Sequence, residues 1–276
     1  MAKVRIQKVL AEAGVASRRT AEEMVLTGRV AVNGKVVTAL PCFVDLPADR
    51  IHVDGSPLRI RRHEKVYLLL NKPRGVVCTQ GEAEGRAKAV DLVPKIPGGR
   101  VYCVGGLDMD GTGLLLLTND GELTHYLTHP RYGVPKTYVV EIEGVLSAED
   151  ISAVKRGVYL DGRRTAGAAL KVLRKSPGRS LIELTVTEGR NREIRRTLLQ
   201  FGMKVCRLKR VAIGPITDRG VKIGNFRPLK PFEVAKLRRC GDLPMGRSKV
   251  EGGRSKGEGK REEGVGRRGK GRGSRQ

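Results

Sequence analysis

The chain has 276 residues, enough for two compact domains or one large domain with an appendage. It contains 54 Lys and Arg residues against 29 Asp and Glu, which gives a formal net charge of +25. This net charge lies far outside the range of an ordinary cytosolic enzyme. It indicates a polyanionic partner, and nucleic acid is the usual one.

Residues 1–62 predict two short helices followed by a hairpin. Gly14 ends the first helix, and Ser17 or Thr20 can cap the second; Thr20 with Glu23 also fits a capping box. Asn33-Gly34 lies between Val-rich runs, which is typical of a tight hairpin turn. The apolar residues of the first helix fall mostly on one face: Val4, Ile6, Val9, Leu10 and Val15.

Basic residues lie close to these elements, at Arg18, Arg19, Arg29 and Lys35. A basic cluster is often only a solvated face. Here, however, the pieces "QKVLAEAGVASRR", "AEEMV", "GRVAVNG" and "DRIHVDG" together resemble the small RNA-binding domain named after ribosomal protein S4, over about residues 3–55. The resemblance implies docking on structured RNA through its phosphates and shape, with Arg18, Arg19 and Lys35 as candidate contacts.

Residues 63–240 predict a second domain with more strands than helices and no strict alternation of the two. We therefore expect an α+β protein: a small helix-helix-hairpin RNA-binding domain, then a mixed, largely antiparallel β-sheet catalytic domain with flanking helices. The predicted strands are "KVYLLLNKPRGVV", interrupted at 72–75, "RVYCVGGL", "GLLLLTNDG", "KTYVVEIEG", "AALKVLRK" and "SLIELTVTEG". The predicted helices are "ELTHYLTH", a capped helix from Ser147, and "NREIRRTLLQFG".

The stretch Asp108-Met109-Asp110-Gly111-Thr112 resembles the nucleophile loop of haloacid-dehalogenase-type phosphatases. In that fold the loop follows an N-terminal strand, and later segments supply a Lys and an acidic pair for Mg²⁺. Here it lies beyond residue 100 and runs directly into "LLLL", and no GDxxxD or DD pair follows downstream. The position therefore weighs against a phosphatase.

The body is similar to the bacterial ribosomal-RNA pseudouridine synthases of the RsuA type. Five motifs carry the resemblance in order: "LLLNKPRGVVCT", "GGLDMDGTGLLLLTNDGEL", "HPRYGVPKTYVVEIEG", "VTEGRNREIRRTLLQFG" and "VCRLKRVAIGPI". The resemblance implies isomerisation of a uridine without metal or cofactor, with Asp108 as the nucleophile. It also implies that the nucleotide is flipped into a pocket, where Tyr138 stacks or assists proton transfer and Leu208 packs against the base. The "EGRNREIRR" stretch and the basic tail are closer to the large-subunit (23S) enzymes.

The helix from Asn191 supplies the remaining candidate residues. Ile194, Leu198 and Phe201 form a stripe that should face the core. Arg195 lies about a quarter turn from that stripe, where a cation can pair with a buried carboxylate and keep it ionised. Arg195 matches the family's active-site basic residue, so we expect an Asp108–Arg195 ion pair. Arg192 and Arg196 point away from the core and are expected to contact phosphates.

Two positions depart from the family pattern. Gly106 replaces the usual Arg before Leu-Asp, and Gly111 replaces the usual Thr, which predicts a more flexible loop. Arg74 and Arg131 are candidates to compensate for the missing Arg. The departures keep a second function open, that of a non-catalytic ribosomal-RNA-binding or ribosome assembly protein.

Other features have simpler interpretations. His125 and His129 have a zinc-compatible spacing but no apparent third ligand, so no metal site is predicted. Asp110 is either a second acid–base carboxylate or, more simply, organises the loop through an Asx turn. The cysteines are five in number and never in a CxxC spacing, which indicates reduced core thiols: Cys42, Cys78, Cys103, Cys206 and Cys240.

Residues 241–276 predict a disordered basic tail. From Gly246 onward it holds 11 Lys and Arg against 4 Asp and Glu, and it is too poor in apolar residues to form a core. We expect it to tether RNA non-specifically, although a passive solvated tail is the alternative. No apolar run is long enough to cross a membrane, and we expect a cytoplasmic protein. We also expect a monomer whose partners are ribosomal RNA and ribosome assembly intermediates.

Overall fold

The computed structural model describes residues 3–46, 48–59, 64–79, 81, 83–96 and 100–242. The predicted boundary between residues 62 and 63 lies outside these residues, as does the predicted tail beyond Asp242. Within the described part of the chain, no helix is long and apolar enough to span a membrane.

The N-terminal part combines two helices with short strands around a core of its own. Its elements are β1 (Val4–Arg5), α1 (Ile6–Glu12), α2 (Arg18–Leu26), β2 (Val30–Val32), β3 (Lys35–Val37), β4 (Phe43–Val44), β5 (Ile51–Val53) and β6 (Ser56–Pro57). The strands pair antiparallel in the order β3-β2-β5-β6, and β1 pairs with β4. Ile6, Leu10 and Val25 are fully buried between these elements.

Local sequence signals account for this arrangement. Ser17, rather than Thr20, is the N-cap of α2: its hydroxyl accepts a hydrogen bond from Thr20 N at 3.1 Å. Asn33 and Gly34 both adopt left-handed backbone angles, with φ of 52° and 81°, as a type I′ hairpin turn requires. The helices and the hairpin predicted for this region are therefore confirmed.

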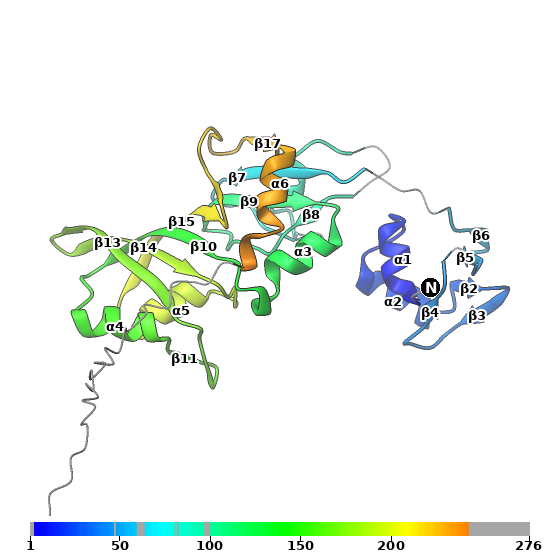
Figure 1. The fold of residues 1–276 in the computed structure, drawn as a ribbon, viewed down its shortest axis with the longest axis horizontal. Helices are drawn as coiled ribbons and strands as arrows, with labels where there is room; N and C mark the ends of the chain where they lie inside the picture. Colours follow the sequence, from blue (N-terminus) through cyan, green and yellow to red (C-terminus); the bar gives the residue numbers. More distant parts are fainter. Residues whose placement is uncertain are drawn as a thin grey trace, which may run out of the picture. The chain divides into compact units, whose positions relative to one another are not determined.

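The body is built on one large sheet (Figure 1). Its strands are β7 (Tyr67–Lys72), β8 (Tyr102–Cys103), β9 (Thr112–Thr118), β10 (Lys136–Glu143), β13 (Ala168–Ser176), β14 (Arg179–Val186), β15 (Lys204–Ile213), β16 (Ile216–Thr217) and β17 (Phe226–Pro228). The described strands follow the order β13-β14-β10-β15-β9-β7-β17, with β16 beside β15 and β8 beside β9. Only β9 and β15 pair in parallel among them, so the predicted mixed, largely antiparallel α+β fold is confirmed.

Helices cover the sheet and complete its cores. They are α3 (Gly121–Thr128), α4 (Ala148–Arg156), α5 (Glu193–Leu199) and α6 (Pro231–Leu237), with 3-10 turns η1 (Ala89–Leu92), η2 (Pro130–Tyr132) and η3 (Cys240–Asp242) and a small hairpin of β11 (Tyr159–Leu160) and β12 (Arg163–Arg164). Helices α3 and α6 share a core with β7 and β9, whereas α4 and α5 share one with β10 and β14. Leu114 to Leu117 of β9 are all buried because both faces of that strand are covered.

The parallel pairing of β9 with β15 depends on Gly113. Its φ is +103°, and a Cβ atom there would lie 2.2 Å from the carbonyl oxygen of Arg210. Only glycine permits this close approach. The approach brings the loop before β9, which contains Asp108, against Leu208 and Arg210 of β15.

The structure corrects several predicted boundaries. The strand predicted from "RVYCVGGL" is shortened to Tyr102–Cys103. The helix expected from Asn191 begins at Glu193, because Arg192 takes a left-handed conformation with φ of 50°. Ser147 and Asp150 form the expected capping box at α4. Strands β11, β12, β16 and β17 and helix α6 were not predicted.

Candidate active site

Asp108 lies in the loop between β8 and β9, and backbone contacts hold this loop from two directions. Gly111 N donates to Asp108 O at 3.0 Å, and Gly75 N donates to Met109 O at 2.8 Å. Lys72 Nζ donates to Val76 O at 2.8 Å and lies 3.4 Å from Met109 O. The Lys72 side chain is fully buried, and burial lowers its pKa. The loop is therefore held in place by backbone contacts although it contains Gly106 and Gly111.

Arg195 of α5 joins the two carboxylates of the loop. Its Nε donates to Asp108 Oδ2 at 3.2 Å, and its Nη2 lies 2.7 Å from Asp110 Oδ2. Its Nη1 also donates to Val205 O at 3.1 Å, so the guanidinium is fixed in position. The expected Asp108–Arg195 ion pair is present. The Asx-turn interpretation of Asp110 is wrong, because its carboxylate reaches across to Arg195 instead.

The two neighbouring arginines of α5 behave differently from one another. Arg192 Nη1 lies 3.5 Å from Asp108 Oδ2, so Arg192 belongs to the same charge cluster. Arg196 forms two contacts with Asp161 of the β11–β12 turn. These pairings place Arg192 at the carboxylate and Arg196 one helical turn away. The phosphate contacts expected of both residues stay predictions.

Asp108 keeps one carboxylate oxygen available. Its side chain is 26 % exposed, and both arginines approach Oδ2. No described residue donates to Oδ1. A carboxylate oriented by two arginines, with one oxygen that accepts no hydrogen bond from the described residues, has the geometry that a nucleophile requires.

The floor of the site is formed by neighbouring strands β10 and β15. Tyr138 lies opposite Arg210 and Val140 lies opposite Leu208, so these side chains share one face of the sheet. Tyr138 and Leu208 are both buried. Leu208 Cδ2 would lie 3.6 Å from a Cβ atom at Gly111, which places it against the nucleophile loop. The structure therefore brings Asp108, Arg195 and Leu208 together around one loop.

Arg210 is a site residue that the sequence reasoning missed. It is almost fully buried, its Nε donates to Leu114 O at 2.6 Å, and its Nη1 lies 3.3 Å from Gly106 O and 3.4 Å from the Tyr138 hydroxyl. Its Nη2 has no partner among the described residues. The signal was its position two residues after Leu208, which puts both side chains on the same face of a strand.

Cys78 contacts the loop, and Cys103 forms a hydrogen bond to Cys78. Leu107 N donates to Cys78 Sγ at 3.4 Å, and a Cβ atom at Gly106 would lie 3.9 Å from Cys78 Cβ. The hydrogen bond from Cys103 and the nearby cations Lys72 and Arg210 lower the pKa of Cys78, against the effect of burial. Of the five cysteines predicted to be core thiols, Cys240 is buried and the other four are only partly buried.

The remaining predicted residues lie elsewhere. Arg74 is exposed in the turn whose Gly75 contacts Met109, whereas Arg131 lies over the Tyr132 ring at 4.4 Å. Arg18, Arg19 and Lys35 are exposed on the N-terminal part. The His125 and His129 rings are 5.0 Å apart, and the described residues include no group of three or more His, Cys, Asp or Glu side chains placed to hold a metal ion.

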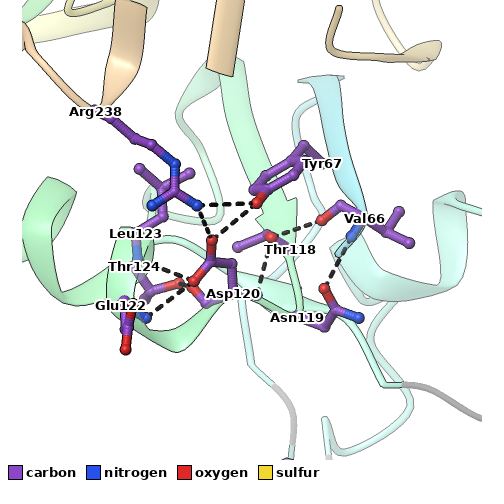
Figure 2. A network of polar contacts seen from close by, with 9 residues as sticks. All are labelled: Val66, Tyr67, Thr118, Asn119, Asp120, Glu122, Leu123, Thr124 and Arg238. Atoms are coloured by element: carbon purple, nitrogen blue, oxygen red, sulfur yellow. Dashed lines mark hydrogen bonds and ion pairs between the residues drawn. The ribbon is translucent and has the colours of Figure 1, made fainter. Parts of the chain in front are cut away.

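A second aspartate lies at the other end of β9 (Figure 2). Asp120 is the N-cap of α3: its Oδ1 accepts from Glu122 N at 3.1 Å and from Leu123 N at 3.2 Å. Its Oδ2 accepts from the Tyr67 hydroxyl at 2.8 Å and from Arg238 Nη2 at 2.6 Å. Thr118 and Asn119 extend the network to the backbone of Val66, so Asp120 is part of a closed structural cluster.

Comparison with known families identifies the class of protein to which this mixed sheet belongs. The family model for RNA pseudouridylate synthase matches residues 66–200, and the S4 domain model matches residues 4–40. Together with the relatives described next, these matches show that the chain belongs to the RNA pseudouridylate synthase family. Membership in this family overturns the phosphatase alternative.

Individual relatives cover most of the chain. Ribosomal large subunit pseudouridine synthase B of Bacillus subtilis is 45 % identical over 86 % of this chain and 97 % of its own length. The protein of the same name from Salmonella typhimurium is 37 % identical over 87 % of this chain and 84 % of its own. A crystal structure of a pseudouridylate synthase superposes with a TM-score of 0.62 at 29 % identity, covering 85 % of this chain and 99 % of that one.

Proposed function

We propose that this chain converts a uridine of large-subunit (23S) ribosomal RNA to pseudouridine, with Asp108 as the nucleophile. The observation that carries the assignment is the Asp108 carboxylate, whose Oδ2 is held by Arg195 and Arg192 while Oδ1 has no donor from any described residue. Similarity to two enzymes named for the ribosomal large subunit supports the choice of RNA. The S4 domain match and the net charge of +25 agree with an RNA substrate.

The reaction breaks the bond between uracil N1 and ribose C1′ and forms a bond between C5 and C1′. The product is an isomer of the substrate: C5 loses a proton and N1 gains one, so no cofactor or metal is required. Asp108 forms the covalent intermediate, and Arg195 orients its carboxylate for the attack. Tyr138 assists the movement of the proton, with its hydroxyl oriented by Arg210.

The target base must leave its stack to reach Asp108. We infer that the nucleotide is flipped into the site and that Leu208 packs against the base there. Arg192, whose side chain is half exposed, contacts the phosphate of the flipped nucleotide in this proposal. Arg18, Arg19 and Lys35 of the N-terminal domain supply further backbone contacts. The same arrangement suits a monomer acting on free ribosomal RNA or on assembly intermediates.

The test uses unmodified ribosomal RNA from a strain lacking the gene, with pseudouridine mapped by chemical labelling and primer extension. Wild-type protein should introduce one new pseudouridine in large-subunit RNA. Asp108→Asn should lower the rate by at least about 10³-fold, because the amide is not a nucleophile. Asp110→Asn is the matched control: it alters the other carboxylate on Arg195 and should retain modification within about tenfold.

Each outcome assigns a different role. Modification that survives in Asp108→Asn but not in Asp110→Asn would move the nucleophile to Asp110. No modification by wild-type protein, with RNA binding retained, would favour the non-catalytic ribosome assembly protein. Product formation should also persist in EDTA when monovalent salt keeps the RNA folded, whereas loss under these conditions would point to a required metal ion.

A further inference from the structure

The β11–β12 hairpin presents an aromatic side chain and two arginines to solvent. Its turn residues Asp161 and Gly162 have φ of 52° and 72°, which gives a tight hairpin. Tyr159 is 66 % exposed, and Arg164 lies directly opposite it in the strand pairing. Because directly opposed residues share a face, the Tyr159 ring and the Arg164 guanidinium form one surface. Figure 1 shows the β11 hairpin extending from the body beyond α4 and α5.

The hairpin is held by α5 and its flanking residues, through backbone carbonyl oxygens of the hairpin and the Asp161 side chain. Gln200 Nε2 donates to Tyr159 O at 2.7 Å. Arg190 donates to the carbonyl oxygens of Arg163 and Arg164 at 3.2 and 3.1 Å. Arg196 of α5 pairs with Asp161 in the turn. These contacts hold the hairpin backbone in place and leave the side chains of Tyr159 and Arg163 exposed. Little conformational entropy of the backbone is therefore lost on binding.

The charge at the hairpin is positive and largely unpaired. Asp161 is its only acidic residue, and Arg196 already occupies that carboxylate. Arg163 is exposed and makes no side-chain hydrogen bond or ion pair with the described residues, and Arg164 makes only a weak contact, 3.4 Å, to Gly157 O. Guanidinium groups in this state bind phosphate oxygens, and an exposed tyrosine ring stacks on an unpaired base.

The hairpin is also connected to the catalytic loop through one short helix. Arg192 contacts Asp108, and Arg196, one turn or about 6 Å further along α5, contacts Asp161. A strand of RNA whose nucleotide enters the site at Asp108 would pass the hairpin within a few nucleotides. A charged aromatic platform at this position suits RNA better than an apolar protein partner, which would require a larger exposed apolar patch.

We propose that the β11–β12 hairpin is an RNA-binding platform of the body: Arg163 and Arg164 bind phosphates beside the target nucleotide, and Tyr159 stacks on an unpaired base. The proposal rests on the proposed RNA substrate. It assigns a contact surface beyond the nucleophile, its arginines and the N-terminal RNA-binding domain.

The probe is unmodified large-subunit ribosomal RNA transcribed in vitro, with binding measured by filter retention at several salt concentrations. Arg163→Ala/Arg164→Ala should raise the Kd about tenfold and lower the slope of log K against log salt by about one to two. The control, Lys171→Ala/Arg174→Ala, removes the same charge from exposed positions of β13 and should change the Kd less than about twofold. Equal effects of the two double variants would overturn the phosphate assignment.

The stacking contact has its own pair of variants. Tyr159→Ala should raise the Kd about fivefold without changing the salt slope, and Tyr159→Phe should retain near wild-type binding because it keeps the ring. If Tyr159→Ala and Tyr159→Phe bind alike, stacking is refuted. If all hairpin variants bind naked RNA like wild type, the hairpin is not an RNA contact and a protein partner takes its place.

These binding results are separable from the enzymatic proposal. The backbone atoms that fix the hairpin are unchanged in every variant, so thermal unfolding should be unaltered and a loss of binding reports the side chains. Weakened binding by the hairpin variants with no pseudouridine from wild type would retain the platform and reject the proposed catalysis. The converse, an active wild type with unaffected hairpin variants, would reject the platform alone.

Discussion

Strand β9 has an aspartate near each end, and the two differ in how fully their oxygens are occupied. Asp120, after the strand, is 3 % exposed, and both of its oxygens accept hydrogen bonds (Figure 2). Asp108, before the strand, is 26 % exposed; Arg195 donates to its Oδ2, and no described residue donates to its Oδ1. Both carboxylates have an arginine partner. The two aspartates therefore do not differ in having an ion pair; they differ in the open oxygen of Asp108, the residue that we propose as the nucleophile.

The environment of Asp120 also fixes its charge. Burial raises its pKa, but the Leu123 N–H, the Tyr67 hydroxyl and the Arg238 guanidinium outweigh burial, and the net pKa is lowered. The carboxylate is thus ionised, and both of its oxygens accept hydrogen bonds from protein groups. Such a group stabilises the fold but has no free oxygen to offer to a substrate.

Removing the cation from Asp108 should have a large effect on catalysis. Arg195→Ala leaves Asp108 and Asp110 without their shared partner, and we expect the single-turnover rate to fall about 10²- to 10³-fold with little change in stability. Arg192→Ala, at a longer distance and on an exposed side chain, should cost about tenfold. Rates are measured under enzyme excess on unmodified ribosomal RNA. Equal losses of rate in the two variants would mean that Arg195 contributes no more to catalysis than Arg192 does.

Removing the carboxylate at the other end of the strand should instead affect folding. Asp120→Ala loses the cap of α3 and leaves Arg238 and Tyr67 without their acceptor, so the free energy of unfolding at pH 7 should fall by about 3 kcal/mol. Urea denaturation measures this change. The folded variant should still form pseudouridine at 20 °C at close to the wild-type rate, and a catalytic defect without destabilisation would contradict the comparison.

The same variant has a predictable pH dependence. Because the folded-state pKa of Asp120 is lowered, its contribution is fully present above the unfolded pKa of about 3.9 and is lost as the pH falls through the folded value. The stability gap between wild type and Asp120→Ala should therefore narrow in acid. A gap that stays constant down to pH 2 would show that hydrogen bonding to the charged form is not the cause.

The sequence predicted the ion-pair partner of Asp108 but not the partners of Asp120. Local patterns predicted the Asn33-Gly34 turn and the Ser147 cap, because each depends on residues within four positions. The partners of Asp120 lie 53 and 118 residues away, and no local spacing reveals them. The Asp108–Arg195 pair spans 87 residues and was predictable only because a family resemblance marked both ends.

Asp110 and the hairpin show the same limit. The Asx turn was the best local interpretation of Asp110, but a partner on α5 displaced it. The exposed hairpin at Tyr159 was not predicted from "YLDGRR". Its position is held by contacts from Arg190, Arg196 and Gln200, which lie in a later segment. Contacts that are closed by the tertiary fold are therefore the part that sequence patterns do not supply.

The smallest expected effect concerns Gly106, where relatives of the RsuA type usually have Arg. A Cβ atom there would lie 3.9 Å from Cys78 Cβ, and its φ is not left-handed, so Gly106→Arg should change the unfolding free energy by less than about 0.5 kcal/mol. The substitution adds a cation two residues before Asp108, and we expect it to raise kcat/KM about two- to fivefold. Gly113→Ala is the contrasting control, because its Cβ would meet Arg210 O and should unfold the β9–β15 pairing. A Gly106→Arg protein that folds but loses activity would show that this chain has rebuilt its site around the glycine.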